Sequence, residues 1–359
     1  MDNLPLELIR QIVAFLPRQE GGRRSLTSTS LVSSTLRTPC QEILFSHLIL
    51  SNVPARPIRK QLPSQRILSL KETSPDIARY FKRLTIADSL RAECGWVSKD
   101  AALPKALHWI TSMTGITSLT VASMRWNEYD SETKSAIIAF ISSPLLISLT
   151  INSSPLELLS VPGPSLKDLT LYQCSPRASE ISGSPRDWSQ LRSLSFSGSP
   201  LGDSPFVDLN KFLLQSESVG VWTSLQDLQA LVWLSEQERN AMDKFISKHG
   251  VGLKRLSLDF VRYRANNEHG TSRLDLSNSA ALETLELAYR HKALQPPESN
   301  PIGGWRDWAD WQDPLPFIFR TLETIQPNTS LRCLTIKIQN SNLCDLAIPS
   351  GYRRLNYDS

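Results

Sequence analysis

The sequence predicts an α/β protein in which a small amino-terminal helical cluster precedes a long array of short parallel strands and outer helices. Two observations carry this prediction. A phrase of the form apolar-x-x-Leu-x-apolar recurs nine times from residue 81 onward, whereas the first 46 residues show the period of helices. A repeated strand cannot bury its apolar edge alone, so the repeats are expected to stack into a solenoid. We therefore expect two modules, residues 1–46 and 47–359, with a Pro-rich basic connector at 52–66.

The amino-terminal module is expected to contain three short helices. The first is indicated by an apolar stripe at helical spacing: Leu8, Ile9, Ile12, Val13 and Leu16. Pro5 suits the first helical position, because its fixed φ matches a helix and its missing N–H costs nothing there. A second helix is expected from Arg24 to Arg37, and a short third one after Pro39. A cluster of this size is too small to be robust without a neighbour.

Each copy of the phrase is expected to form one strand. The central leucines are spaced 20 to 49 residues apart, mostly near the length of a strand-plus-helix unit. They are Leu84, Leu119, Leu149, Leu169, Leu194, Leu228, Leu256, Leu285 and Leu334. The same spacing at Phe45-x-x-Leu48-x-Leu50 indicates a first strand joined directly to the helical cluster.

Helices are expected between several of these strands. Residues 101–113 and 130–142 carry apolar side chains at helical spacing. The sequence Ser235-Glu-Gln-Glu238 is a capping box that precedes another such stretch, which Gly250 ends. Residues 314–325 repeat the pattern. No capping element is evident in 353–359.

The composition excludes several classes of function. The net charge is only +4, so no nucleic-acid footprint is visible; residues 1–70 carry +5 and the rest of the chain carries −1. The basic amino-terminal part either binds an acidic partner or is an ordinary solvated surface. No apolar run approaches a membrane span and no secretory signal is present, so we expect a soluble protein of the cytoplasm or nucleus. Five scattered cysteines are consistent with reduced thiols.

The sequence also argues against an enzyme. The five histidines are scattered, and none has the spacing of a metal site or lies beside a carboxylate pair of catalytic spacing. No phosphate-binding loop, dinucleotide fingerprint or nucleophile elbow is present. We therefore expect no catalytic residues, no metal and no cofactor.

The repeated phrase resembles that of leucine-rich repeat proteins over residues 81–340. The match is degenerate, because only Cys174 supplies the Asn or Cys that this family places at the ninth position. The side-chain ladder that normally turns each repeat is therefore largely missing.

The amino terminus resembles an F-box. The residues that carry this resemblance are Leu4-Pro5-Leu6-Glu7-Leu8-Ile9, Ile12-Val13, Leu16, Leu26 and Ser30–Leu36. Leu36 stands where the family usually has Trp. The two modules in this order are similar to fungal F-box proteins with irregular leucine-rich repeats, over nearly the whole chain.

The resemblance implies a substrate receptor of an SCF ubiquitin ligase. The helical cluster would dock on a Skp-family adaptor, and through it a cullin, while the repeats would hold an unknown target protein. The alternative is a non-catalytic scaffold whose helices only cap the solenoid. The resemblance implies that the adaptor-facing residues are Leu4, Pro5, Leu8, Ile9, Leu31, Val32 and Leu36.

Two regions are candidates for target contacts. Side chains between the apolar positions point outward from the strands. In the earlier repeats these outward residues are mostly Thr, which suits strands and need not bind anything. The candidate residues are Tyr172 beside this outward row, Asp227, Arg255, Asp259 and Glu286 in the later repeats, and the tryptophan cluster Trp305, Trp308 and Trp311. The alternative for the tryptophans is that they pack back onto the helical side.

Overall fold

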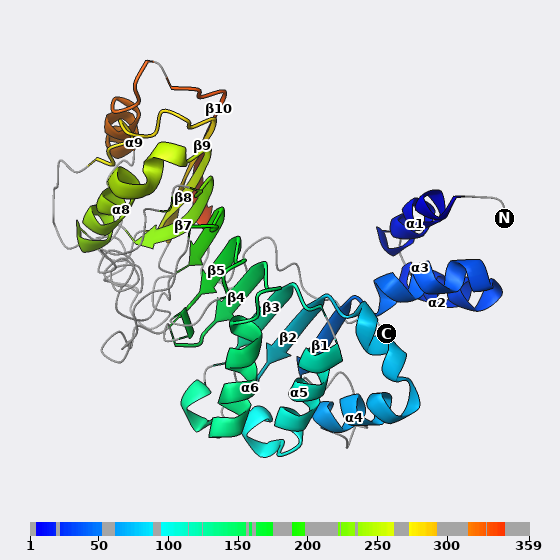
Figure 1. The fold of residues 1–359 in the computed structure, drawn as a ribbon. Helices are drawn as coiled ribbons and strands as arrows, with labels where there is room; N and C mark the ends of the chain where they lie inside the picture. The colour runs from blue at the N-terminus through cyan, green and yellow to red at the C-terminus, as the bar shows by residue number, and fades with distance from the viewer. Residues whose placement is uncertain are drawn as a thin grey trace, which may run out of the picture. The chain divides into compact units, whose positions relative to one another are not determined.

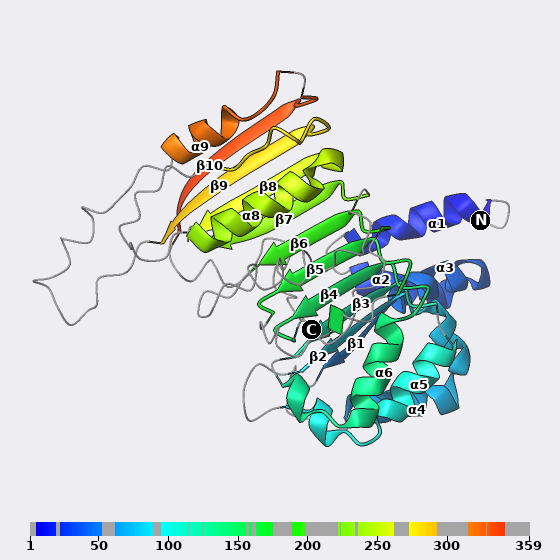
Figure 2. The same ribbon diagram turned by 60° about the vertical axis from the view of Figure 1, so that its left-hand side comes forward.

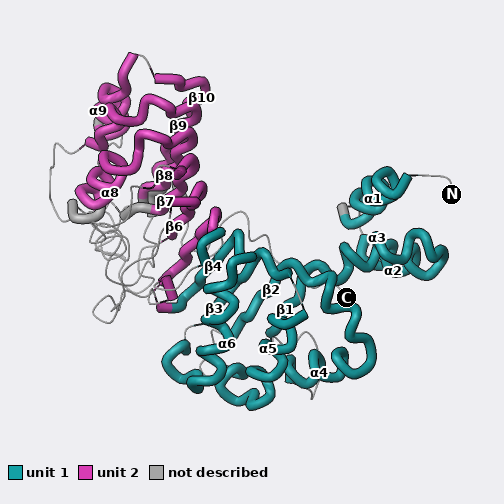
Figure 3. The backbone as a smooth tube through the Cα atoms, in the orientation of Figure 1, with its two compact units in different colours: residues 1–154, 161–165 teal, residues 155–160, 166–359 magenta. Residues whose placement is uncertain are grey.

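The computed structural model of the chain is a mixed α/β structure with ten strands among its described residues. Figures 1 and 2 show the ribbon from two directions. The structure describes residues 5–18, 22–51, 62–88, 95–113, 115–123, 125–155, 158–159, 163–174, 189–197, 222, 224–233, 236–261, 273–292, 315–327 and 329–341. The chain divides into two compact units, residues 1–154 with 161–165 and residues 155–160 with 166–359 (Figure 3).

All nine phrases form strands, which confirms the prediction that each copy of the phrase is a strand. In the first unit the strands are β1 (His47–Ser51), β2 (Arg83–Ala87), β3 (Ser118–Ala122) and β4 (Ser148–Asn152). The second unit contains β5 (Asp168–Tyr172), β6 (Ser193–Ser197), β7 (Asp227–Trp233), β8 (Arg255–Val261), β9 (Thr284–Lys292) and β10 (Cys333–Ser341). Within each unit the order of strands in the sheet follows the order in the chain.

The register explains why the phrase repeats. Parallel pairing places Leu84 beside Leu119 and Leu119 beside Leu149, so the central leucines form one column in the first unit. The second unit has a column of its own, in which the central leucines of β5 to β10 are neighbours. The central leucines of β2 to β9 are at most 2% exposed. Burial of the column is therefore supplied by neighbouring strands, as a stacked architecture requires.

Helices cover one face of the strands in each unit (Figures 1 and 2). We call β1–β4 the first sheet and β5–β10 the second sheet, although all ten strands are hydrogen-bonded in sequence order. In the first unit the helices are α4 (Pro63–Thr73), α5 (Leu103–Met113) and α6 (Ser131–Ile141), each in contact with the next. In the second unit they are α8 (Glu236–His249) and α9 (Leu315–Leu322). Four of these five were predicted. The exception is α4, whose first residues 63–66 fall in the expected connector but form the start of a helix instead of an extended chain; Pro63 at its first position favours this.

Helix α4 obtains its cap from a distant part of the chain. The residue before it is Leu62, whose side chain has no polar atom with which to bind the free amides of the first turn. The buried carboxylate of Asp100 takes this role, because it accepts from the backbone N–H of Ser64 at 3.2 Å and from the Ser64 hydroxyl. Asp100 directly follows the 3-10 helix η3 (Val97–Lys99), which it thereby joins to α4.

The amino-terminal helices are α1 (Leu6–Phe15), α2 (Gly22–Val32) and α3 (Ser34–Leu44). The predicted helix at 24–37 is wrong as a single element, since it breaks at Ser33. That residue is extended (φ −144°, ψ 135°), and its carbonyl accepts the first hydrogen bond of α3 from Arg37 at 3.0 Å. Pro39 lies inside α3 instead of preceding a new helix, and it is buried there.

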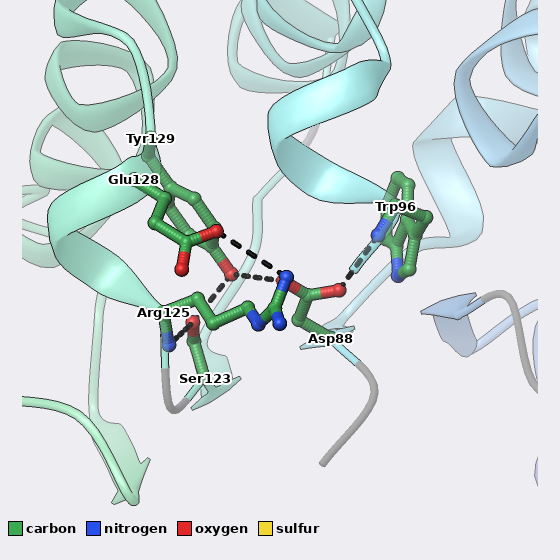
Figure 4. A network of polar contacts seen from close by, with 6 residues as sticks. All are labelled: Asp88, Trp96, Ser123, Arg125, Glu128 and Tyr129. Carbon is green, nitrogen blue, oxygen red and sulfur yellow. Dashed lines mark hydrogen bonds and ion pairs between the residues drawn. The ribbon is translucent and has the colours of Figure 1, made fainter. Parts of the chain in front are cut away.

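Polar side chains that follow β2 and β3 form a hydrogen-bonded network. Asp88 and Ser123, which follow β2 and β3, each donate a backbone hydrogen bond to the next strand, at 2.8 Å to Ala122 and 3.0 Å to Asn152. Their side chains meet at Tyr129, which follows the 3-10 helix η4 (Trp126–Glu128) (Figure 4). Asp88 also accepts from the backbone N–H of Trp96 at 2.9 Å. These turns are therefore closed by an irregular polar network.

Candidate functional site

The amino-terminal cluster has a small apolar core of its own. Ile9 and Val13 of α1 pack with Leu26 of α2 and Cys40 of α3, and each of these four side chains is at most 3% exposed. Partly buried residues complete this core: Leu16, Leu36, Ile43 and Leu44. An ion pair of 3.0 Å between Arg10 and Glu42 joins α1 to α3 at the surface. The cluster thus holds its helices together without using all of its apolar side chains.

The remaining apolar residues of α1 and α2 face solvent. On α1, Leu8, Ile12 and Phe15 are 45%, 54% and 60% exposed, and their spacing of four and three residues places them on one face. Leu31 and Val32 at the end of α2 are 77% and 81% exposed. Exposed apolar side chains in groups are typical of surfaces that bind another protein. We call these five residues the exposed helical residues.

The predicted adaptor-facing residues divide into three groups. Pro5, Leu8, Leu31 and Val32 are exposed, as contact with a partner requires. Ile9 is 3% exposed and belongs to the core of the cluster, and Leu36 is partly buried against the same core. Leu4 lies outside the described residues.

The sequence prediction missed Phe15 and assigned Ile12 to the buried stripe. Five apolar positions at 8, 9, 12, 13 and 16 were interpreted as one face of a helix. In the structure, Ile9 and Val13 point inward, and Leu8 and Ile12 point outward with Phe15. The signal that could have separated them is the second i, i+4, i+7 series, 8–12–15, which runs beside the first.

The helical cluster is joined to the first sheet without a linker. Helix α3 ends two residues before β1, and the carbonyl of Ser46 between them accepts hydrogen bonds from the amides of Lys82 and Arg83, both at 2.9 Å. The Ser46 hydroxyl donates back to Ile43 in α3 at 2.9 Å. The first strand pair therefore holds the end of the helical cluster through Ser46.

The outward face of the first sheet is mostly small and polar. Thr85, Thr120 and Thr150 are neighbours in register on β2, β3 and β4. At the edge, His47 of β1 hydrogen-bonds Thr85 at 2.9 Å. Burial and the nearby charge of Arg83 lower the pKa of His47. No charged residue lies among the outward positions of β3 and β4, so this face offers hydrogen bonds and little charge.

The outward face of the second sheet carries paired charges. Asp227 of β7 and Arg255 of β8 are neighbours in register, and the guanidinium binds both carboxylate oxygens, one of them at 2.7 Å. Glu286 of β9 and Lys337 of β10 form a second pair at 2.6 Å. Asp168 of β5 is largely exposed; partial desolvation of its carboxyl, together with the charge of Asp227, raises its pKa.

The structure brings some of the predicted target residues together. Asp227 and Arg255 pair with each other, and Glu286 pairs with Lys337, which the sequence analysis did not select. Tyr172 and Asp259 are half-buried on β5 and β8. Trp305, Trp308 and Trp311 lie outside the described residues.

Two searches concern classes of site other than protein contact. Among the described residues, no group of three or more His, Cys, Asp or Glu side chains is placed to hold a metal ion. Over the same residues, no helix is both long and apolar enough to cross a membrane.

Comparison with known protein families gives one match. Residues 1–38 match the family model of the F-box domain. The match contains α1 and α2, including all five exposed helical residues. The match supports an F-box protein. F-box domains generally bind Skp-family adaptors in SCF complexes. No curated protein matches the chain at a significant level.

Proposed function

We propose that this chain is a substrate-recognition subunit of an SCF-type ubiquitin ligase and is not itself an enzyme. The helical cluster, residues 1–46, docks on a Skp-family adaptor and through it on a cullin. The remainder, residues 47–359, acts as an irregular leucine-rich-repeat solenoid that binds a target protein. Such a protein works in the cytoplasm, the nucleus or both.

The exposed helical residues carry this proposal. If the helices only capped the sheet, their spare apolar side chains would be covered by the chain itself. Leu31 and Val32 are instead more than three-quarters exposed, although the cluster and the first sheet belong to one compact unit. Roughly 1.5–3 kcal/mol is gained when such a side chain is fully buried, so an exposed apolar face of this kind favours a partner. The F-box match covers the same residues.

The target half of the proposal is supported by the shape of the repeats. In each unit the described helices lie on one face of the strands, and stacked repeats use the opposite face for binding. In the second unit this face contains the Asp227–Arg255 and Glu286–Lys337 pairs, and the selected residues Tyr172 and Asp259 lie on its strands. We propose these residues, together with Trp305, Trp308 and Trp311, as candidates for target contact.

Co-purification with a Skp-family adaptor tests the proposal that the helical cluster docks on this adaptor. The double variant Leu31→Ser/Val32→Ser is expected to lower affinity for the adaptor by about a hundredfold or more, because two side chains of this size, when fully buried, contribute roughly 3 kcal/mol or more to an interface. The matched control is Leu145→Ser/Val251→Ser, which changes two residues that are 53% and 68% exposed elsewhere. Both variants should keep the circular dichroism spectrum of the parent chain.

The proposal fails if the unaltered chain does not bind the adaptor, or if the control loses binding as strongly as the test variant. Adding a cullin separates the two candidate functions. A substrate receptor retains both adaptor and cullin in one complex, whereas a scaffold with a helical cap retains neither.

A further inference from the structure

The residues that directly precede the strands of the second sheet form a continuous row. The strands β5 to β10 are neighbours in chain order (Figure 2), so the residues before them are neighbours as well. Each residue of the row after the first donates its backbone N–H to the carbonyl of the one before it, at 2.8 to 2.9 Å. We call this set the edge row, and its members are Lys167, Arg192, Gln226, Lys254, Glu283 and Arg332.

The edge row is rich in positive charge. Four of its six residues are cations and only Glu283 is an anion, whereas residues 71–359 as a whole carry a net charge of −1. Of the four corresponding residues that precede β1 to β4, only Lys82 is charged. The concentration of cations is therefore a local feature of the second unit.

The fold does not neutralise these cations. Arg192, Lys254 and Arg332 are exposed, and Lys167 is half-buried. Within the described part of the chain, every ion pair involves other residues, so none of the four cations has a carboxylate partner there. Neighbouring like charges repel one another, and an anionic group that binds along the row relieves this repulsion.

The acidic residues beside the edge row leave an excess of positive charge. Asp227 is already bound by Arg255. Partial desolvation and then the charge of Asp227 raise the pKa of Asp168. The nearby charges of Lys167 and Arg192 lower that pKa but do not offset the rise. Counted together with the residue that follows each member, the row holds five cations and three anions, which is a net charge of +2.

We propose that the edge row binds an acidic segment of the target protein, in an extended conformation that runs across the strands. This inference rests on the proposed function, since it names the chemistry of the target. Neighbouring strands lie about 4.8 Å apart, so the row from β5 to β10 is about 24 Å long. An extended chain spans about 3.3–3.6 Å per residue, so a segment of about seven residues matches this length.

The positions of the cations predict where the acidic residues of the segment lie. Lys167 and Arg192 precede adjacent strands, about 4.8 Å apart along the row. Lys254 and Arg332 each follow after a step of two strands, about 9.6 Å. Acidic residues at about positions i, i+1, i+4 and i+7 of an extended segment would therefore meet one cation each. The position opposite Glu283 should not be acidic, because like charges repel.

Fluorescence anisotropy with the full chain tests this inference. The probe is a fluorescein-labelled peptide of about eight residues, with glutamate at these four positions and serine elsewhere. It is compared with the same peptide carrying lysine in place of glutamate, and with an oligothymidine of similar length. The acidic peptide should bind, and its affinity should fall as salt is raised, because exposed charge pairs are screened. Equal or tighter binding of either comparison probe would overturn the inference.

A pair of double variants locates the binding. Arg192→Gln/Lys254→Gln is expected to lower the affinity for the acidic peptide about fivefold, because each contact is an exposed ion pair of modest strength. The matched control is Lys244→Gln/Arg320→Gln, which removes the same charge from exposed positions on α8 and α9 of the same unit. Both variants should keep the circular dichroism spectrum of the parent chain. An equal loss of affinity in the two variants, or no loss in the first, contradicts binding at the edge row.

Adaptor binding is measured separately, so the two proposals can fail independently. Leu31→Ser/Val32→Ser should leave the affinity for the acidic peptide unchanged, and Arg192→Gln/Lys254→Gln should leave adaptor binding unchanged. A chain that binds the acidic peptide but no adaptor would contradict the proposed function alone. A chain that binds the adaptor but not the acidic peptide would contradict only the role of the edge row.

Discussion

The Tyr129 hydroxyl lies 3.2 Å from a carboxylate oxygen of Asp88 and 2.5 Å from the hydroxyl of Ser123, so it joins the ends of β2 and β3. An ionised carboxylate only accepts hydrogen bonds, so the phenol donates to Asp88 and Ser123 donates to the phenol. Asp88 and Tyr129 are 6% and 4% exposed. Burial is the main cause that raises the pKa of Tyr129, and the phenol therefore stays protonated and able to donate.

Tyr129→Phe should destabilise the first unit. The substitution removes the donor to Asp88 and leaves a buried carboxylate with fewer partners, which costs about 1–3 kcal/mol. Tyr80→Phe is the control, because Tyr80 is also buried but its hydroxyl accepts from the exposed side chain of Arg79. The measurement is the urea midpoint of unfolding, followed by circular dichroism. Equal midpoints for both variants would show that the network does not stabilise the fold.

Asp100→Ala should destabilise the start of α4. Its carboxylate binds the backbone N–H and the hydroxyl of Ser64, and loss of a helix cap costs about 0.5–2 kcal/mol. Asp76→Ala is the matched control, because Asp76 is an exposed acidic residue in the 3-10 helix η2 (Pro75–Tyr80). Amide exchange of residues 63–66 should rise in the first variant alone. A comparable rise in the control would contradict the assignment of Asp100 as the cap.

The Asp227–Arg255 pair should contribute little to stability. The side chain of Arg255 is 69% exposed, so water and salt screen its attraction to Asp227. A double-mutant cycle with Asp227→Ala and Arg255→Ala, followed by urea unfolding, should give a coupling energy below about 1 kcal/mol. A coupling energy of several kcal/mol would instead mark the pair as a structural element. With weak coupling, both variants can test target binding without disturbing the fold.

His249 should make the second unit sensitive to acid. It is 4% exposed, its ring lies 5.2 Å from Trp222 and 4.8 Å from Phe245, and neither ring nitrogen has a hydrogen-bond partner among the described residues. Burial, and secondarily the charge of Lys248, lowers its pKa from 6.5 to about 4. As the pH falls, His249 is therefore protonated at a lower pH in the folded state than in the unfolded state.

The resulting loss of stability falls between pH 6.5 and pH 4. In that range the unfolded chain is protonated while the folded His249 is neutral, so the free energy of unfolding decreases by on the order of 3 kcal/mol as the pH is lowered. His249→Leu should flatten this part of the profile, whereas the exposed His108→Leu should not. Urea unfolding at a series of pH values measures both. An unchanged slope in His249→Leu would rule out this histidine as the cause.

Periodic features were the part of the fold that could be predicted. The phrase around Leu119 or Leu256 determines which side chains are buried, and a strand follows because only alternate residues can share one face. One helix end was predictable for the same local reason: Gly250, the expected stop, directly follows α8, which ends at His249. The break between α2 and α3 at Ser33 was harder to predict, because no strong local signal marks an extended residue inside a helical pattern.

Only part of the candidate site could be predicted from the sequence. The F-box resemblance selected Leu31 and Val32, which are exposed, but it also selected Ile9, which packs inside the cluster. Neighbouring apolar residues on one helix look alike in a sequence, and only the position of α2 and α3 decides which of them face water. Likewise, Arg255 and Asp227 are 28 residues apart in the chain, and they meet only because the strands pair in register.

The sequence by itself determined that this chain is an amino-terminal helical module followed by repeated strands, because repetition and periodicity are local properties of the residues. The tertiary structure decided the long-range contacts: the Asp100 cap of α4, the Tyr129 network after β2 and β3, and the division of α1 into a buried and an exposed face. These depend on where separate elements come to lie. That is set by the packing of the whole unit and not by the spacing within any one element.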